Sequence, residues 1–124
     1  MTVNGASFTK CARLLKPADY SRVFKKAIRS SDRLLTILAS SNDLGHPRLG
    51  LVISRKNAKR AVDRNRIKRV IRESFRLHQI ELPSADFVVM ARPDTKLADN
   101  QEIFKSLEHH WNRLIKQCVK SSSQ

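Results

Sequence analysis

The clearest candidates for chemistry are the cations between Arg55 and Arg72, where the chain reads RKNAKRAVDRNRIKRVIR. This stretch holds nine of the chain's 25 Lys and Arg residues and a single acid, Asp63, so its formal charge is +8. The rest of the chain, with 16 basic and 10 acidic residues, carries only +6. A concentrated cationic cluster binds polyanions with salt-dependent affinity, because docking releases condensed counterions. We therefore expect nucleic acid as the partner.

The second half of this stretch has the period of an amphipathic helix. Small or apolar residues follow the spacing i, i+3, i+4, i+7, i+8, at Ile67, Val70, Ile71, Ser74 and Phe75. At 100° per residue, polar and cationic residues gather on the opposite side, at Asn65, Arg69, Arg72 and Arg76, with Arg66 and Lys68 on the flanks. The pattern predicts a helix that covers a sheet and presents its charges to solvent or RNA.

An ordinary solvated helix face is the alternative explanation for these charges. Such faces usually mix acids and bases, whereas Arg64 with Lys68 and Lys68 with Arg72 are like-charged pairs at i, i+4. Their repulsion is relieved when an anion binds, and the arginine fork suits phosphate. Asn65 offers a donor and an acceptor for a base edge or a 2′-hydroxyl, or alternatively bonds local backbone.

The elements that must position this helix can be read from the flanking patterns. Pro17 opens a short helix with Tyr20, Val23 and Phe24 on one face. The apolar runs 33–40 and 48–54, separated by turn formers, predict an antiparallel strand pair, and 86–92 predicts a central or nearly central strand. A last helix is expected to start with Asp99 as its N-cap and Glu102 at position N3, with Trp111 in the core.

Length and composition bound the remaining possibilities. The 124 residues, 40% of them hydrophobic, predict one domain with a core over about 10–119 and flexible ends at 1–9 and 120–124. No apolar run approaches the length of a membrane span and no signal peptide precedes the domain, so we expect a cytoplasmic protein. Cys11 and Cys118 stand alone, and no carboxylates or histidines form a catalytic or metal-binding constellation. We predict no catalytic residue and no metal ligand in the protein.

The triplet Arg64-Asn65-Arg66, followed by IKRVIRESFR, resembles the RNR signature of the bacterial ribonuclease P protein subunit. The resemblance continues upstream through HPRLGLVISRKNAKRAVD and downstream through LPSADFVVMAR, and it covers most of residues 13–115. It implies an α+β fold, a small ribosomal-protein-like sandwich in which helices pack on a mixed sheet of about four strands, in the order α-β-β-β-α-β-α. It also implies an unusual left-handed crossover around the RNR helix, against the general handedness rule.

The resemblance further implies a function. The expected protein is the RNA-binding subunit of the ribonucleoprotein endonuclease that removes the 5′ leader from precursor tRNA, with Mg²⁺ in a large catalytic RNA and none held by the protein. By position, the residues that contact the catalytic RNA are Lys59, Arg60, Arg64, Asn65, Arg66, Lys68, Arg69 and Arg72. By position, the residues that bind the single-stranded leader are Tyr20, Phe24, Phe8, Arg55, Lys56 and Arg92.

Aromatic faces beside cations suit single-stranded RNA, although Phe24 could instead be a core residue. The expected partners are thus the catalytic RNA and precursor tRNA, without a membrane or DNA. A ribosomal or other structural RNA-binding protein is the alternative, since it would share the charge and the fold. A DNA-binding regulator is disfavoured because no helix and tight turn precede the basic helix.

Overall fold

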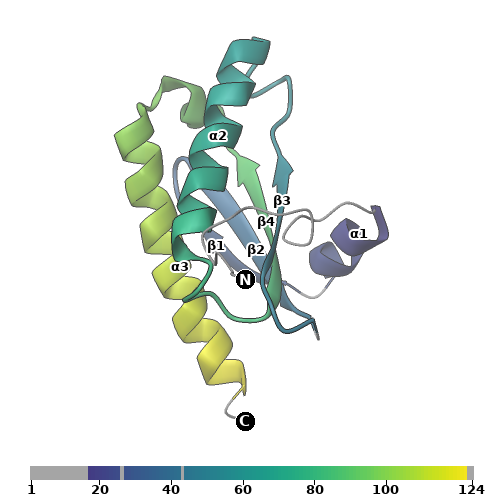
Figure 1. The fold of residues 1–124 in the computed structure, drawn as a ribbon. Helices are drawn as coiled ribbons and strands as arrows, with labels where there is room; N and C mark the ends of the chain where they lie inside the picture. The colour runs from purple at the N-terminus through teal and green to yellow at the C-terminus, as the bar shows by residue number, and fades with distance from the viewer. Residues whose placement is uncertain (1–16, 26, 43, 123–124) are drawn as a thin grey trace, which may run out of the picture.

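The computed structural model describes residues 17–25, 27–42 and 44–122, with side chains through Gln117. Its elements are α1 (Pro17–Lys25), β1 (Ile28–Ser31), β2 (Leu35–Ser41), β3 (Arg48–Val52), α2 (Ala61–His78), β4 (Ala85–Ala91), the 3-10 helix η2 (Pro93–Leu97) and α3 (Asn100–Ser122) (Figure 1). The predicted α+β fold and the predicted order of elements are confirmed, with η2 as an addition.

The four strands form one mixed sheet in the order β1-β2-β4-β3. β4 is antiparallel to β2 and parallel to β3, so the prediction of a central strand there is confirmed. The prediction that 33–40 pairs with 48–54 is wrong, because β4 lies between these strands and pairs with both. Turn formers at 41–47 reverse the chain, but they leave open which strand becomes the neighbour.

β1 was not predicted from the residue pattern. Its sequence, IRSS, is short and mostly polar, and only Ser30 is buried. The strand exists because it pairs with the apolar β2, from Ile28 opposite Ala39 to Ser31 opposite Thr36. Edge strands of this kind take their structure from the neighbour rather than from their own pattern.

The parallel pair β3 and β4 is joined across the sheet by α2. In Figure 1 the chain rises along β3, returns along α2 on the near side of the sheet, and rises again along β4 to the left of β3. This connection is a left-handed crossover, as the resemblance implied and against the usual preference.

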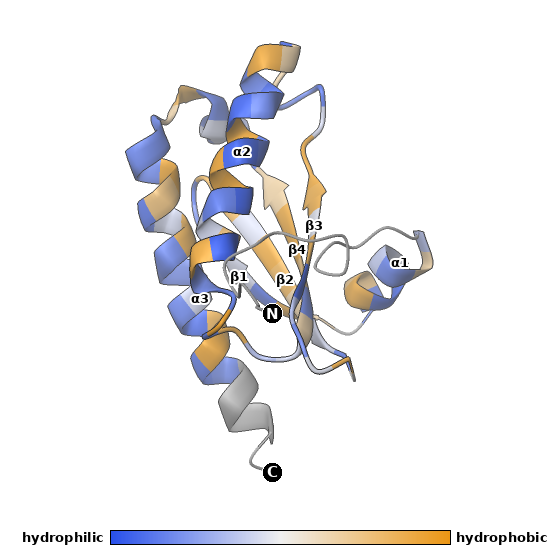
Figure 2. Cartoon of the chain, in the orientation of Figure 1, coloured by the Kyte–Doolittle hydropathy of each residue, from blue (hydrophilic) through white to orange (hydrophobic). Residues whose placement is uncertain are grey.

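Alternation along the strands gives the sheet two different faces. Ile37, Phe87 and Val89 point to the side covered by α2 and α3, where Phe75 and Trp111 complete the main core. Ring centroids of Phe87 and Trp111 lie 5.6 Å apart in an edge-to-face arrangement. Figure 2 shows β2 and β4 as largely hydrophobic and α2 as banded. This core fixes α2 with its cations outward.

The other face of the sheet carries α1 and a smaller apolar cluster. Val23 of α1 packs there with Leu38 and Val88, and Tyr20 and Met90 contact the cluster. Figure 1 shows α1 standing apart from α2 and α3 on its own side of the sheet.

α3 begins as the sequence predicted. The Glu102 amide donates to Asp99 Oδ1 at 2.8 Å, and the Asp99 amide donates to Glu102 Oε1 at 3.2 Å, which is a reciprocal capping box. Trp111 is fully buried and its indole N–H donates to Ser74 Oγ at 2.9 Å. Ser74 therefore belongs to the buried stripe of α2 because it serves as the acceptor for this tryptophan.

Candidate nucleic-acid interface

The outer side of α2 is cationic and largely without acidic partners. Ile67, Val70, Ile71, Ser74 and Phe75 are buried, as the helical period predicted. Asn65, Arg69 and Arg72 are exposed on the other side. Within the part of the chain that the structure describes, the guanidinium groups of Arg69 and Arg72 have no hydrogen bond or ion pair. Their charges are therefore available to an external anion.

A shallow, open hollow lies along this side of the helix. It has a volume of about 350 Å³ and is lined by Asn65, Arg69, Arg72, Glu73 and Arg76. Glu73 accepts hydrogen bonds from Arg76, one of them from Nε at 3.2 Å, and these bonds hold the pKa of the Glu73 carboxyl below its usual value. Glu73 thus neutralises Arg76, which reduces the repulsion between Arg76 and its like-charged neighbour Arg72, four residues earlier.

The two arginines of the RNR triplet are half-buried and have acceptors within the protein. One nitrogen of Arg64, Nη1, donates to the carbonyl oxygens of Ala58 at 2.9 Å and Lys59 at 2.8 Å. Arg66 Nη1 donates to Asn100 Oδ1 at 2.8 Å, at the start of α3. Asn65, between them, is exposed and lines the same hollow as Arg69 and Arg72. The triplet therefore mixes side chains tied to the protein with one that is open.

Lys59 and Arg60 are exposed in the segment that leads into α2, and Lys68 is half-buried on the flank of the helix. The predicted residues all belong to α2 or to the segment before it. Four of them, namely Lys59, Arg60, Arg69 and Arg72, are exposed cations.

The predicted aromatic pair on α1 is divided between two environments. The ring of Tyr20 is half-buried and packs on Gly50 of β3, where an added Cβ would lie 2.7 Å from the ring. Phe24 is 51% exposed, so the alternative that it belongs to the core is wrong. Phe8 lies outside the described residues.

The cations predicted beside these rings lie at one edge of the sheet. β3 and β4 are parallel and end together, and Arg55, Lys56 and Arg92 follow their ends as exposed side chains. Arg92 reaches Ser31 Oγ of β1 at 3.4 Å. The strand surface between α1 and this edge is a cross-strand row formed by Ser31, Thr36, Met90 and Val52.

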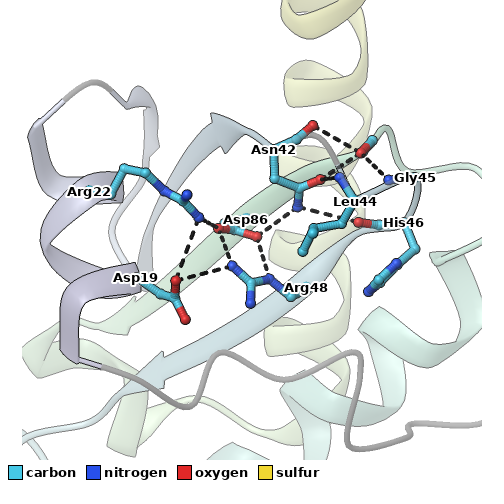
Figure 3. Close-up of polar contacts among 9 residues, drawn as sticks. Asp19, Arg22, Asn42, Leu44, Gly45, His46, Arg48 and Asp86 are labelled. Carbon is cyan, nitrogen blue, oxygen red and sulfur yellow. Dashed lines mark hydrogen bonds and ion pairs between the residues drawn. The ribbon is translucent and has the colours of Figure 1, made fainter.

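A buried carboxylate connects α1 to the sheet (Figure 3). Arg48 of β3 binds Asp86 through two bonds of 2.8 Å, and Arg22 of α1 donates to the same carboxylate at 2.7 Å. The side-chain amide of Asn42 donates to Oδ1 of Asp86 at 2.7 Å. Burial alone would raise the pKa of Asp86, but these bonds outweigh it and hold the pKa below its usual value. Asp19 lies 3.4 Å from Arg48 and completes the cluster.

Comparison with known proteins decides the family. The sequence model described as Ribonuclease P matches residues 8–115. The chain belongs to the ribonuclease P protein family. The ribonuclease P protein component of Methylococcus capsulatus is 50% identical over 119 residues, which cover 96% of this chain and 93% of the relative. The component of Photobacterium profundum is 48% identical over 112 residues, covering 90% and 95%.

Solved structures of the family share the fold. The RNase P protein of Staphylococcus aureus matches with a TM-score of 0.79 and 36% identity, over 86% of this chain and 97% of that one. The RNase P protein of Thermotoga maritima matches with a TM-score of 0.74 and 28% identity, over 82% and 96%. Family members are protein subunits of an endoribonuclease whose catalytic centre is in its RNA. The chain is such a subunit, and the ribosomal alternative is not favoured.

One group of side chains in this ribonuclease P protein has the residue types of a hydrolase triad. Ser30 Oγ lies 2.6 Å from Nδ1 of His110, and Nε2 of His110 lies 3.2 Å from Asp32 Oδ2 without a well-aligned hydrogen bond. Burial lowers the pKa of His110, and the charge of Asp32 only partly opposes this. Ser30 and His110 are buried under α3, so a substrate has no access. The group fastens α3 to the β1–β2 turn.

Among the described residues, no three His, Cys, Asp or Glu side chains come together in a way that could hold a metal ion. No described helix is both long and apolar enough to cross a membrane.

Sequence reasoning missed the residues that organise the site from inside. Asp86, Arg48 and Asn42 were not singled out, although they determine where α1 sits. Asp86 is the second residue of an otherwise apolar strand, and this isolated acid was a usable signal that a cation must reach it. The acceptors of Arg64 are backbone carbonyls, which leave no signal in a sequence.

Proposed function

We propose that this ribonuclease P protein binds its catalytic RNA through one basic surface, the outer side of α2 with the segment before it. The surface consists of Lys59, Arg60, Arg64, Asn65, Arg66, Lys68, Arg69 and Arg72. The observation that carries the proposal is the pair Arg69 and Arg72, exposed side by side on one helical face with no acidic partner in the described residues. Guanidinium groups in this position suit phosphate, which they bind through two hydrogen bonds.

In this proposal the assembled particle cleaves precursor tRNA and releases its 5′ leader. The RNA partner holds the Mg²⁺ ions, which stabilise the charge that develops during phosphodiester cleavage. The protein contributes binding, since its cations lower the repulsion between the catalytic RNA and the tRNA substrate. Neither DNA nor a membrane takes part.

We further propose that the α1 face of the sheet binds the single-stranded leader. Tyr20 and Phe24, with Phe8 outside the described residues, would stack on bases, and Arg55, Lys56 and Arg92 would contact the backbone. Supporting this, Phe24 is exposed, and the three cations stand at the sheet edge where β3 and β4 both end. Asp86 neutralises Arg22 and Arg48 underneath, which leaves the cations of the edge as the positive groups.

Reconstitution tests the proposed function. The cognate RNA, mixed with precursor tRNA at physiological salt, should cleave the substrate faster and at lower Mg²⁺ concentration when the protein is added. The double variant Arg69→Ala/Arg72→Ala should need a higher protein concentration for the same rate, because it removes two phosphate contacts. No acceleration by the wild-type protein, or co-sedimentation of the protein with ribosomes instead of with one discrete RNA, would contradict the proposal.

Leader recognition is tested separately with Tyr20. Tyr20→Ala should weaken the binding of leader-bearing precursor tRNA to the particle by roughly 1 to 3 kcal/mol, the value of one stacked base. Binding of mature tRNA, which lacks the leader, should change little. Tyr20→Phe is the matched control, since it keeps the ring on Gly50 and should retain affinity. Equal losses on both tRNAs would exclude Tyr20 from leader binding.

A further inference from the structure

The segment 54–60, which joins β3 to α2, is fixed at several points although it is rich in cations. The amides of Asn57 and Ala58 donate to the Ser54 carbonyl at 3.2 and 3.1 Å, which forms a turn. The side chain of Asn57 donates to the Ala91 carbonyl at the end of β4 at 2.8 Å, and Ala58 is fully buried. The first part of the segment is therefore tied to the sheet.

The last part of the segment lacks an ordinary helix cap. Arg60 occupies the N-cap position in an extended conformation, and its side chain makes no capping hydrogen bond. Ser, Thr, Asp or Asn would usually fix the entry to a helix at this position. Lys59 and Arg60 also repel one another and the other cations nearby. The Arg60 carbonyl accepts the amides of Asp63 and Arg64 at 3.1 Å, so any further contact that holds these two residues against the first turn of α2 has to come from another side chain.

Arg64 makes that contact from within the helix. Its Nη1 nitrogen donates to the carbonyl oxygens of both Ala58 and Lys59, at 2.9 and 2.8 Å. A charged donor makes stronger hydrogen bonds than a neutral one, and here one cation grips two consecutive carbonyl groups. These two hydrogen bonds orient the backbone of Lys59. They thereby set the directions in which the side chains of Lys59 and Arg60 extend into solvent. Both side chains are exposed.

We propose that Arg64, the first residue of the RNR triplet, is a positioning residue, which acts on the catalytic RNA by holding Lys59 and Arg60 in place. The inference rests on the proposed RNA-binding role of the basic surface and assigns a division of labour within it. Arg69 and Arg72 contact phosphate themselves, because they are exposed and have no acceptor in the described residues. Arg64, by contrast, is half-buried, and one nitrogen of its guanidinium group already donates two hydrogen bonds to carbonyl oxygens of the protein.

A double-mutant cycle on binding to the cognate catalytic RNA separates the two roles. Arg64→Ala is measured in the wild-type background and in the background Lys59→Ala/Arg60→Ala, with Arg69→Ala in both backgrounds as the matched control. We expect the affinity loss from Arg64→Ala to be at least about threefold smaller in the second background, whereas the loss from Arg69→Ala stays the same. An equal loss from Arg64→Ala in both backgrounds, or none in the wild type, would overturn the positioning role.

Amide hydrogen exchange of the free protein gives a test that needs no RNA. Arg64→Ala should raise the exchange rates of the Asn57, Ala58 and Asp63 amides, which all belong to the segment or the first turn of α2. Arg69→Ala should leave these rates unchanged. Unchanged rates in Arg64→Ala would overturn the inference even if RNA binding falls. By contrast, a wild-type affinity for the RNA in Arg69→Ala/Arg72→Ala would overturn the proposed function of the surface itself.

Discussion

The two sides of the sheet use arginine in opposite ways. On the α1 side, Arg22 and Arg48 both bind the buried carboxylate of Asp86, and these ion pairs neutralise their charges within the protein. On the outer side of α2, Arg69 and Arg72 face solvent with no partner among the described residues. The same side chain thus serves as a structural tie in one region and as an anion-binding group in the other.

The difference shows that the acceptors around an arginine decide its role. Asp86 is an obligatory acceptor, because a buried carboxylate without cations would be strongly disfavoured. The α2 surface offers few acceptors, so its free cations gain most of their stabilisation when RNA binds. Arg64 and Arg66 stand between these extremes, since each has a neutral acceptor within the protein.

The largest effect on stability is expected from removing Asp86, the carboxylate at the centre of the α1 side. Asp86→Ala should lower the free energy of unfolding by roughly 3 to 5 kcal/mol, because it removes the buried carboxylate that both Arg22 and Arg48 bind. Chemical denaturation measures this value. Asp94→Ala is the control, since Asp94 forms an exposed pair with Arg33 at 3.9 Å and should cost at most about 1 kcal/mol. Similar losses in the two variants would mean that Asp86 does not anchor α1.

The next largest expected effect is a difference between the two sides in how their arginines affect the salt dependence of RNA binding. Removing Arg69 and Arg72 together should reduce the slope of log affinity against log salt by about two units on the catalytic RNA, one per lost phosphate contact. Arg22→Ala removes one charge from the α1 side and should leave that slope unchanged, because Asp86 and Asp19 already neutralise Arg22. Filter binding over a range of salt concentrations compares the variants. A slope that falls equally in Arg22→Ala would erase the distinction between the sides.

Much of the fold was predictable from the sequence because several elements carry strong local signals. The stripe from Ile67 to Phe75 placed α2 and its exposed side, and Asp99 with Glu102 placed the start of α3. The apolar β4 was correctly placed at the centre. Strand pairing was not predictable from local patterns, since β2 and β3 both pair with β4, and a reversal at 41–47 does not specify that arrangement. β1 has no strand signal of its own and forms by pairing with β2.

The candidate site was predictable only as far as residue type and helix period reach. Both indicated the exposed face with Arg69 and Arg72, and the resemblance to the RNR family supplied the α1 face. Asp86 contacts Arg48, Asn42 and Arg22, which lie 38, 44 and 64 positions away from it in the sequence. No periodicity connects these residues. The acceptors of Arg64 are backbone atoms. Such contacts become visible only when the folded chain brings the elements together.

The smallest expected effect is a difference between the two sides of the sheet in how their contribution to folding stability depends on pH. Burial under α3 lowers the pKa of His110 from its ordinary 6.5, so the unfolded chain binds a proton that the folded chain does not. Stability from this neutral histidine is complete above about pH 6.5 and declines as the pH falls, by at most about 1.4 kcal/mol per pH unit. Asp86, on the other side, has a lowered pKa, so its contribution is lost only below its ordinary value of 3.8.

Denaturation at a series of pH values between about 7 and 5 should therefore show a decline that comes from the α3 side. The groups that face His110 are Asp32, which opposes the lowering of its pKa, and His109 and Arg113, which add to it. His110→Asn should flatten the decline, whereas His109→Asn, which removes only a minor cause of the lowered pKa, should keep most of it. A wild-type stability that stays constant over this range would mean that His110 is protonated equally in the folded and unfolded chain, contrary to its burial.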